Sequence, residues 1–165
     1  MKQALRRARA DVLVVGVGSP IRQDDGVGHE MVRLLAQRFP GGLSSEVLFE
    51  PDIGFAETVS RFAELIVLDA WDFDGPEPYR VVDLVPSASC APVQSFVSHV
   101  FDWELILAVA RDVFGHVPKA RLVGVRASAF EYAEQVTPAC MLRAGEALEF
   151  VERCLSLFGS GAEVG

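Results

Sequence analysis

The chain has 165 residues, half of them hydrophobic, and its 23 acidic and 15 basic side chains give a formal net charge of −8. This length predicts one domain with a core large enough to fold without a disulfide or a structural metal, and the hydrophobic content excludes an intrinsically disordered chain. The acidic balance argues against a nucleic-acid partner, because binding to phosphates requires clustered basic side chains.

The two ends of the chain differ from its body. Residues 1–10 carry four basic side chains and no acidic one, whereas residues 159–165 are rich in glycine. We expect a basic flexible arm over 1–10, a single domain over 11–158 and a frayed end over 159–165. No stretch approaches the roughly 20 apolar residues of a membrane span. Three cysteines without a CxxC spacing are typical of a reducing compartment, so we expect a cytoplasmic protein.

The first half of the chain alternates short apolar runs with longer segments of helical periodicity. Uncharged runs rich in β-branched residues predict buried strands, and the segments between them predict helices. In chain order the expected elements are a strand over 12–17, a helix over 26–39, a strand over 46–50, a helix over 54–63 and a strand over 65–70.

The second half continues the alternation. The expected elements are a half-exposed strand over 79–85, a loop over 86–98, a helix over 101–114, a buried strand over 120–127 and a helix over 137–157. Thr137 is expected to cap the last helix, with Pro138 in its first turn, and Trp103 and Phe114 are among the side chains expected to face inward. The pattern predicts an α/β protein of three layers, with a twisted, mostly parallel sheet and helices on both faces.

Three polar side chains are expected at one edge of this sheet. Asp25 follows the first strand, Asp69 ends the third, and His99 precedes the helix expected at 101. Sites in open parallel sheets form beyond the carboxyl ends of the strands. Two carboxylates and one imidazole form a donor set that suits a hard or borderline divalent metal ion.

The loop over 16–28 also resembles a dinucleotide-binding fingerprint. Gly16 and Gly18 fit that motif, but Ile21 stands in place of its third glycine. Asp24 and Asp25 would repel a pyrophosphate, so nucleotide binding is the weaker hypothesis. Capping of the following helix is the simplest role for one of these two acids.

Two further side chains have open roles. Cys90 precedes His99 in the same loop, so a nucleophilic Cys–His pair is conceivable, although a structural thiol is the simpler interpretation. His29, close to the start of the first helix, points either at the site or at solvent.

Four segments, in this order over residues 11–157, resemble the [NiFe]-hydrogenase maturation endopeptidases. They are GVGSPIRQDDGVG, LIVLDAWDFDG, SHVFDWELILAVA and LVGV. The resemblance implies a twisted five-stranded sheet between helices, and an aspartic-type or metal-dependent endopeptidase. Such an enzyme removes the C-terminal extension of a hydrogenase large-subunit precursor after nickel insertion. We expect a monomer without an organic cofactor.

Carried over by position, the resemblance implies that Asp25, Asp69 and His99 are the catalytic and metal-binding residues that recognise the nickel of the precursor. Asp24 matches the neighbouring acid, which carries a weaker functional claim. Ser19 stands where the family usually has asparagine, and Glu50 and Asp52 stand where it often has Asp-Gly-Gly. The same site would also suit a maturation chaperone that checks for nickel and cuts nothing.

Overall fold

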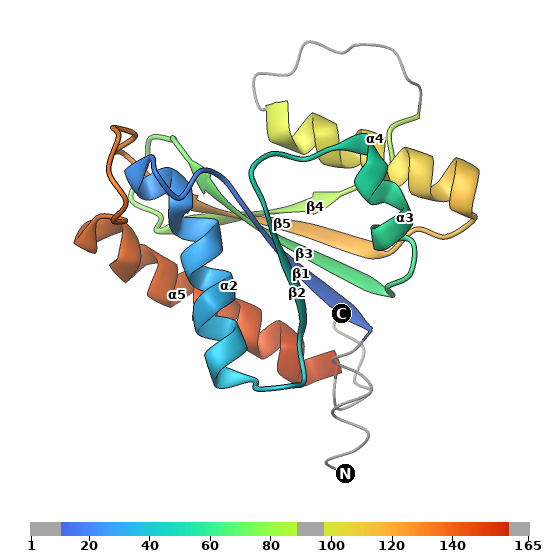
Figure 1. Ribbon diagram of the computed structural model, residues 1–165, viewed down its shortest axis with the longest axis horizontal. Helices are drawn as coiled ribbons and strands as arrows, with labels where there is room; N and C mark the ends of the chain where they lie inside the picture. The colour runs from blue at the N-terminus through green and yellow to red at the C-terminus, as the bar shows by residue number, and fades with distance from the viewer. Residues whose placement is uncertain (1–10, 89–97, 159–165) are drawn as a thin grey trace.

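The computed structural model describes residues 11–88 and 98–158, with the backbone alone at Ser98, His99, Phe101 and Phe158. Its sheet has the strand order β2-β1-β3-β5-β4 (Figure 1). All neighbouring strands are parallel except β4, which runs antiparallel to β5. The strands are β1 (Val12–Val17), β2 (Ser44–Leu48), β3 (Glu64–Trp71), β4 (Tyr79–Leu84) and β5 (Lys119–Arg126).

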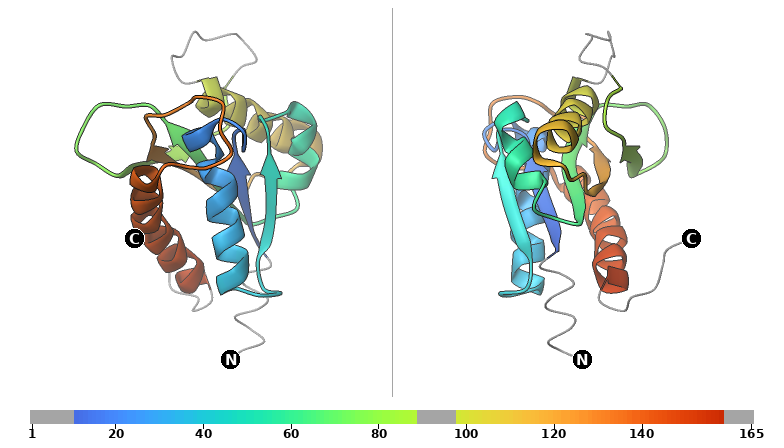
Figure 2. Two further views of the ribbon diagram at one scale, coloured as in Figure 1. Left: turned by 60° about the vertical axis from the view of Figure 1, so that its left-hand side comes forward. Right: turned by 90° about the vertical axis from the view of Figure 1, so that its right-hand side faces the viewer.

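Helices cover both faces of this sheet, as Figure 2 shows from two sides. The long helices α2 (Val27–Arg38) and α5 (Pro138–Phe158) lie on one face, and α3 (Ala56–Val59) and α4 (Ser98–Phe114) lie on the other. Two short 3-10 helices, η1 (Gln23–Gly26) and η2 (Ile53–Phe55), lead into α2 and α3. The predicted three-layer α/β architecture is therefore confirmed.

The two central strands explain why the protein has two cores. All residues of β1 are buried, and successive side chains of a strand point to opposite faces. Val12 and Val14 therefore pack with α2 and α5, whereas Leu13 and Val15 pack with α3 and α4. Each such fully buried aliphatic side chain stabilises the fold by about 1.5–3 kcal/mol.

Two glycines let α2 lie directly against the sheet. A Cβ atom at Gly28 would lie 2.6 Å from the backbone oxygen of Val17, and a Cβ atom at Gly16 would lie 2.6 Å from the carbonyl carbon of Gly28. The start of α2 consequently packs on the ends of β1 and β3. This close packing holds the loop before α2 at the carboxyl edge of the sheet.

The structure corrects several boundaries. The helix expected over 54–63 is η2 followed by a single turn, α3, which ends at Val59. The helix expected to begin at residue 101 begins at Ser98. Phe114, expected to face the core, is 44% exposed, because it is the last residue of α4.

Some predictions fall outside the described residues. They are the basic arm over 1–10, the frayed end over 159–165 and every role suggested for Cys90. In the part of the chain that the structure describes, no helix is long and apolar enough to cross a membrane.

Candidate functional site

The loop between β1 and η1 folds back on itself, so that a backbone N–H near its start binds the side chain of Asp25. The backbone N–H of Ser19 donates to the Oδ2 atom of Asp25 at 2.9 Å. Gly18 permits this turn with a φ of 123°, and a Cβ atom there would collide with the backbone carbonyl of Asp25. The carboxylate of Asp25 is half-buried and is held at the point where β1 ends.

Asp24 points the other way and has a structural role. Its side chain is fully buried, and it accepts hydrogen bonds from the backbone N–H groups of Ser128, Ala129 and Thr137 at 2.9–3.2 Å. Three donors compensate the cost of burying a charged carboxylate. Asp24 therefore ties η1 to the segment that leads into α5.

The prediction that Asp24 or Asp25 caps the helix that follows them is wrong. The N-cap of α2 is Gly26, which offers no side-chain hydrogen bond. The intervening η1 turns Asp24 toward the start of α5 instead. There Thr137 is the N-cap, as predicted, and its Oγ1 accepts the N–H of Cys140 at 3.2 Å.

Asp69 lies at the carboxyl end of β3 and is fully buried. Its Oδ1 accepts the backbone N–H of Ala70 at 2.8 Å, and η1 packs against β3. The residue before Asp69, Leu68, pairs with Gly16 of β1. The structure thus brings the strand that carries Asp69 and the turn that carries Asp25 to the same edge of the sheet, as predicted.

The backbone of His99 lies at this edge of the sheet. It is the second residue of α4, whose amino end lies on the side where β1 and β3 end (Figure 1). The side chain of His99 lies outside the described part of the structure. Within the described residues, no group of three His, Cys, Asp or Glu side chains is arranged to hold a metal ion. The ligand set Asp25, Asp69 and His99 therefore stays a prediction.

His29 joins two elements beside the site. Its Nε2 atom lies 3.0 Å from the backbone oxygen of Leu48, the last residue of β2, so it donates a hydrogen bond there in the Nε2–H tautomer. The same oxygen accepts the N–H of Gly18 at 3.1 Å. The sequence did not determine whether the side chain of His29 points at the site or at solvent. Its position four residues after Asp25 does place the two residues on neighbouring turns.

The acids after β2 have separate surroundings. Asp52 accepts the backbone N–H of Gly54 at 2.8 Å and so caps η2, whereas the side chain of Glu50 is exposed. Ser19, which stands where asparagine is usual in the resembled family, is 2% exposed. Its Oγ has no hydrogen-bond partner among the described residues.

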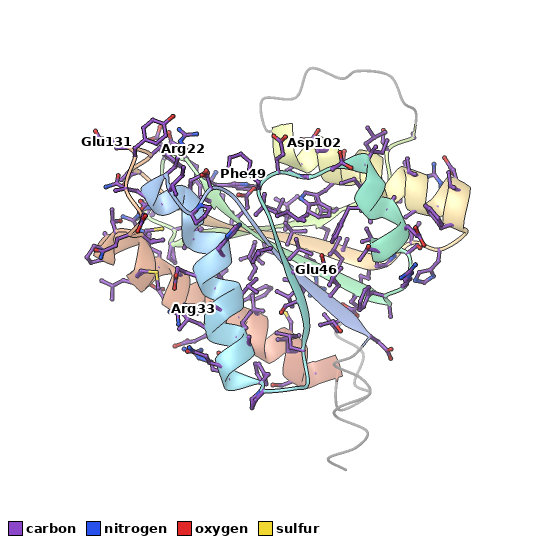
Figure 3. The ribbon with its side chains drawn as sticks, viewed as in Figure 1. Arg22, Arg33, Glu46, Phe49, Asp102 and Glu131 are labelled. Carbon is purple, nitrogen blue, oxygen red and sulfur yellow. The ribbon has the colours of Figure 1, made fainter. Side chains whose placement is uncertain are left out.

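Exposed apolar side chains lie around the same edge. Ile21, Phe49 and Tyr132 are 52%, 66% and 85% exposed. In the view of Figure 3, Phe49 lies between Arg22, which precedes η1, and Asp102, which lies in the first turns of α4. The carboxyl edge therefore combines two acidic side chains with an accessible apolar rim.

The geometry weakens the nucleotide-binding hypothesis. A phosphate at the turn after β1 would use backbone N–H groups as donors. The N–H of Ser19 already donates to Asp25, and the charge of this carboxylate opposes an anion. In the fingerprint, the third glycine lets the helix lie close to the strand. Here Gly28 has that role, although the motif comparison did not single it out.

Comparison with known proteins identifies the class of fold. No protein-family model matches the chain, and no curated protein sequence matches it. Solved structures do match, and they define the fold as that of the hydrogenase maturation endopeptidases.

Three of these structures illustrate the similarity. The hydrogenase maturating endopeptidase HybD from E. coli is 24% identical, with a TM-score of 0.67 over 88% of this chain and 91% of its own. The [NiFe] hydrogenase maturation protease HybD from Thermococcus kodakarensis is 18% identical, with a TM-score of 0.66 over 87% and 98%. The protease HycI from Thermococcus kodakarensis KOD1 is 15% identical, with a TM-score of 0.62 over 92% and 98%.

Proposed function

We propose that this protein is a hydrogenase maturation protease that removes the C-terminal extension of a [NiFe]-hydrogenase large-subunit precursor after nickel insertion. One observation carries the proposal: the carboxylates of Asp25 and Asp69 are both held at the carboxyl edge of the sheet, in the fold of HybD and HycI. We also propose that the protein acts in the cytoplasm as a monomer and without an organic cofactor.

Nickel enters this proposal as part of the substrate. We assign Asp25, Asp69 and His99 as the residues that bind the nickel ion carried by the precursor. Two carboxylate oxygens and an imidazole nitrogen suit a borderline divalent ion. Without the ion, a precursor that covers the two carboxylates would remove water from their negative charges, which disfavours docking. Binding is therefore expected to depend on nickel.

Hydrolysis of the peptide bond requires a base for the attacking water and stabilisation of the oxyanion. In this proposal one of the two carboxylates, Asp25 or Asp69, is the general base. The hydrogen bonds from Ser19 and Ala70 fix the orientation of these carboxylates before the substrate arrives. A nickel ion held by Asp25, Asp69 and His99 would either supply Lewis acidity or serve only to mark the precursor as loaded.

The direct test incubates the protein with the nickel-loaded precursor and measures the mass of the precursor. We expect loss of a C-terminal peptide with the wild type, and no loss with the folded variants Asp25→Asn, Asp69→Asn and His99→Ala. Asp72→Asn is the matched control, because Asp72 is an exposed acid three residues beyond Asp69. Full processing by the Asp69→Asn variant would overturn the assignment.

The same measurement separates the second class of function. A maturation chaperone that only checks for nickel would form a complex with the loaded precursor and leave its mass unchanged. The described residues favour the protease, because two preoriented carboxylates provide a base in addition to a ligand.

A further inference from the structure

The outer edge of β2 is open in the described structure. β2 is the terminal strand of the sheet, and β1 is the only strand that pairs with it among the described residues. Edge strands are usually protected from pairing with another chain by charged side chains, proline, a bulge or short length. The five-residue strand β2 (SSEVL) has one charged side chain, Glu46, but no lysine, proline or bulge, and its pairing with β1 is continuous over all five positions.

The hydrogen bonds of β2 show which backbone groups face outward. The carbonyl of Leu48 points toward β1, because it accepts the N–H of Gly18. The N–H and C=O groups of successive residues in a strand alternate in direction. Those of Ser45 and Val47 therefore point away from the sheet, where an added strand would bind them.

The side chains along this edge are apolar and acidic. Val47 is 50% exposed, and Phe49, in the bend directly after β2, is 66% exposed. Glu46 in β2 and Glu50 in the bend after it are also exposed (Figure 3 shows Glu46 and Phe49 on the segment that crosses the front of the molecule). The edge thus offers backbone pairing, an apolar surface and negative charge together.

This edge leads directly to the candidate site. The bond from Gly18 to Leu48 joins the end of β2 to the turn that holds Asp25. His29 fixes the same carbonyl from α2. A peptide that pairs along β2 therefore continues past Phe49 to the carboxyl edge where Asp25 and Asp69 lie.

We propose that β2 is the docking strand for the substrate: an extended segment of the precursor, with net positive charge, adds to the sheet beside β2. This inference rests on the proposed function. Main-chain hydrogen bonds to Val47 supply affinity, and the acidic side chains select a basic segment. A second copy of this chain is the poorer occupant. Antiparallel pairing of two β2 strands would bring their Glu46 side chains close together, and both chains are strongly acidic.

The decisive variant is Val47→Pro. Proline removes the outward N–H and fills the edge, but it deletes no bond to β1. Val85→Pro is the matched control, because Val85 is an exposed valine directly after β4, at the opposite edge of the sheet. We expect Val47→Pro to raise KM for the nickel-loaded precursor about tenfold with little change in kcat, and Val85→Pro to leave both near the wild-type values. Equal KM values for Val47→Pro and wild type, with the variant folded by circular dichroism, would overturn the inference.

A second measurement needs no variant at position 47. Hydrogen exchange of the wild type is followed before and after addition of the precursor. We expect the amides of Ser45 and Val47 to be protected, and the double variant Glu46→Lys, Glu50→Lys to bind the precursor about tenfold more weakly. Protection that appears without precursor and rises with protein concentration would show self-pairing and overturn the inference.

The cleavage assay tests the proposed function, and the exchange assay tests docking at β2, so either one can be contradicted without the other. If the precursor protects the amides of β2 but keeps its mass, the result contradicts the protease function and supports docking at β2. A precursor that is cut without protection of β2 supports the protease and contradicts the docking strand.

Discussion

The Oδ1 atom of Asp24 lies 2.9 Å from the backbone nitrogen of Thr137, a residue 113 positions further along the chain. This bond joins the loop after the first strand to the start of the last helix. Asp24 and Asp25 are neighbours in sequence, yet one holds the loop in place and the other faces the candidate site.

The first prediction concerns that bond. Asp24→Asn places an amide group among three N–H donors, so at least one of them loses its acceptor inside the protein. We expect the free energy of unfolding to fall by about 2–4 kcal/mol, measured by urea denaturation. Asp25→Asn, which alters a half-buried carboxylate with one backbone donor, is the control and should cost about 1 kcal/mol or less. Equal losses for both variants would contradict the structural role of Asp24.

The second prediction tests the contact between α2 and the sheet. In Gly28→Ala, the new Cβ atom would lie 2.6 Å from the Val17 oxygen, which is backbone and cannot rotate away. We expect a loss of about 3 kcal/mol or more in the free energy of unfolding, or failure to fold.

Gly145→Ala provides the matched control for that variant. Gly145 lies in the long helix α5, and a Cβ atom there meets nothing within 4 Å. Alanine has the higher helix propensity, so we expect this variant to be more stable by up to about 1 kcal/mol. A thermal melt of the two variants beside the wild type gives both answers, and destabilisation by Gly145→Ala would contradict the described packing of α5.

The third prediction concerns thiol chemistry. Burial, which is the largest cause, and the nearby negative charge of Asp24 together raise the pKa of the Cys140 thiol to about 12. Since the thiolate is the reactive form, Cys140 stays protonated and inert at neutral pH. We expect iodoacetamide to leave Cys140 unmodified in the native protein and to label it after denaturation, as mapped by mass spectrometry.

The same experiment addresses Cys90. We expect processing activity to survive iodoacetamide, because the proposed site uses carboxylates and an imidazole. Inactivation that the precursor prevents, with the label on Cys90, would instead favour a cysteine nucleophile.

The fourth prediction concerns the metal ligands. Calorimetric titration with Ni²⁺ and Cd²⁺ should give binding at one site per chain, which is lost in Asp25→Ala, Asp69→Ala and His99→Ala. A wild type that binds neither ion alone, but binds the nickel-loaded precursor more tightly than the nickel-free one, would show that the precursor supplies ligands of its own. Equal affinity for both forms of the precursor would contradict nickel recognition.

Much of the fold was predictable because buried parallel strands have a distinctive sequence. The uncharged run at 12–17 is β1 without any change of boundary, and the Thr-Pro pair at 137 starts α5. The placement of Asp25 and Asp69 at the same edge of the sheet also followed from a general property of parallel sheets.

Other features depend on contacts between distant residues, which periodicity does not reveal. The strand predicted over 46–50 is observed two residues earlier, as β2 (Ser44–Leu48), because the chain bends at Phe49 and Glu50. The pattern predicted a strand but not its place at the edge of the sheet, where Val47 is exposed. The role of Asp24 likewise depends on backbone groups more than 100 residues away. Local sequence therefore located the candidate site, but not the interactions that hold it together.

The long-range bond of Asp24 also has a consequence for biosynthesis. The loop that carries Asp24 and Asp25 is synthesised early, but the backbone groups that bind Asp24 lie at residues 128–137, in the last quarter of the chain. A nascent chain still lacking this segment on the ribosome has no native partners for the Asp24 carboxylate, even when β1 and α2 have emerged. The loop that carries Asp25 is therefore completed only near the end of translation, so a protein truncated before residue 137 is expected to lack an ordered site.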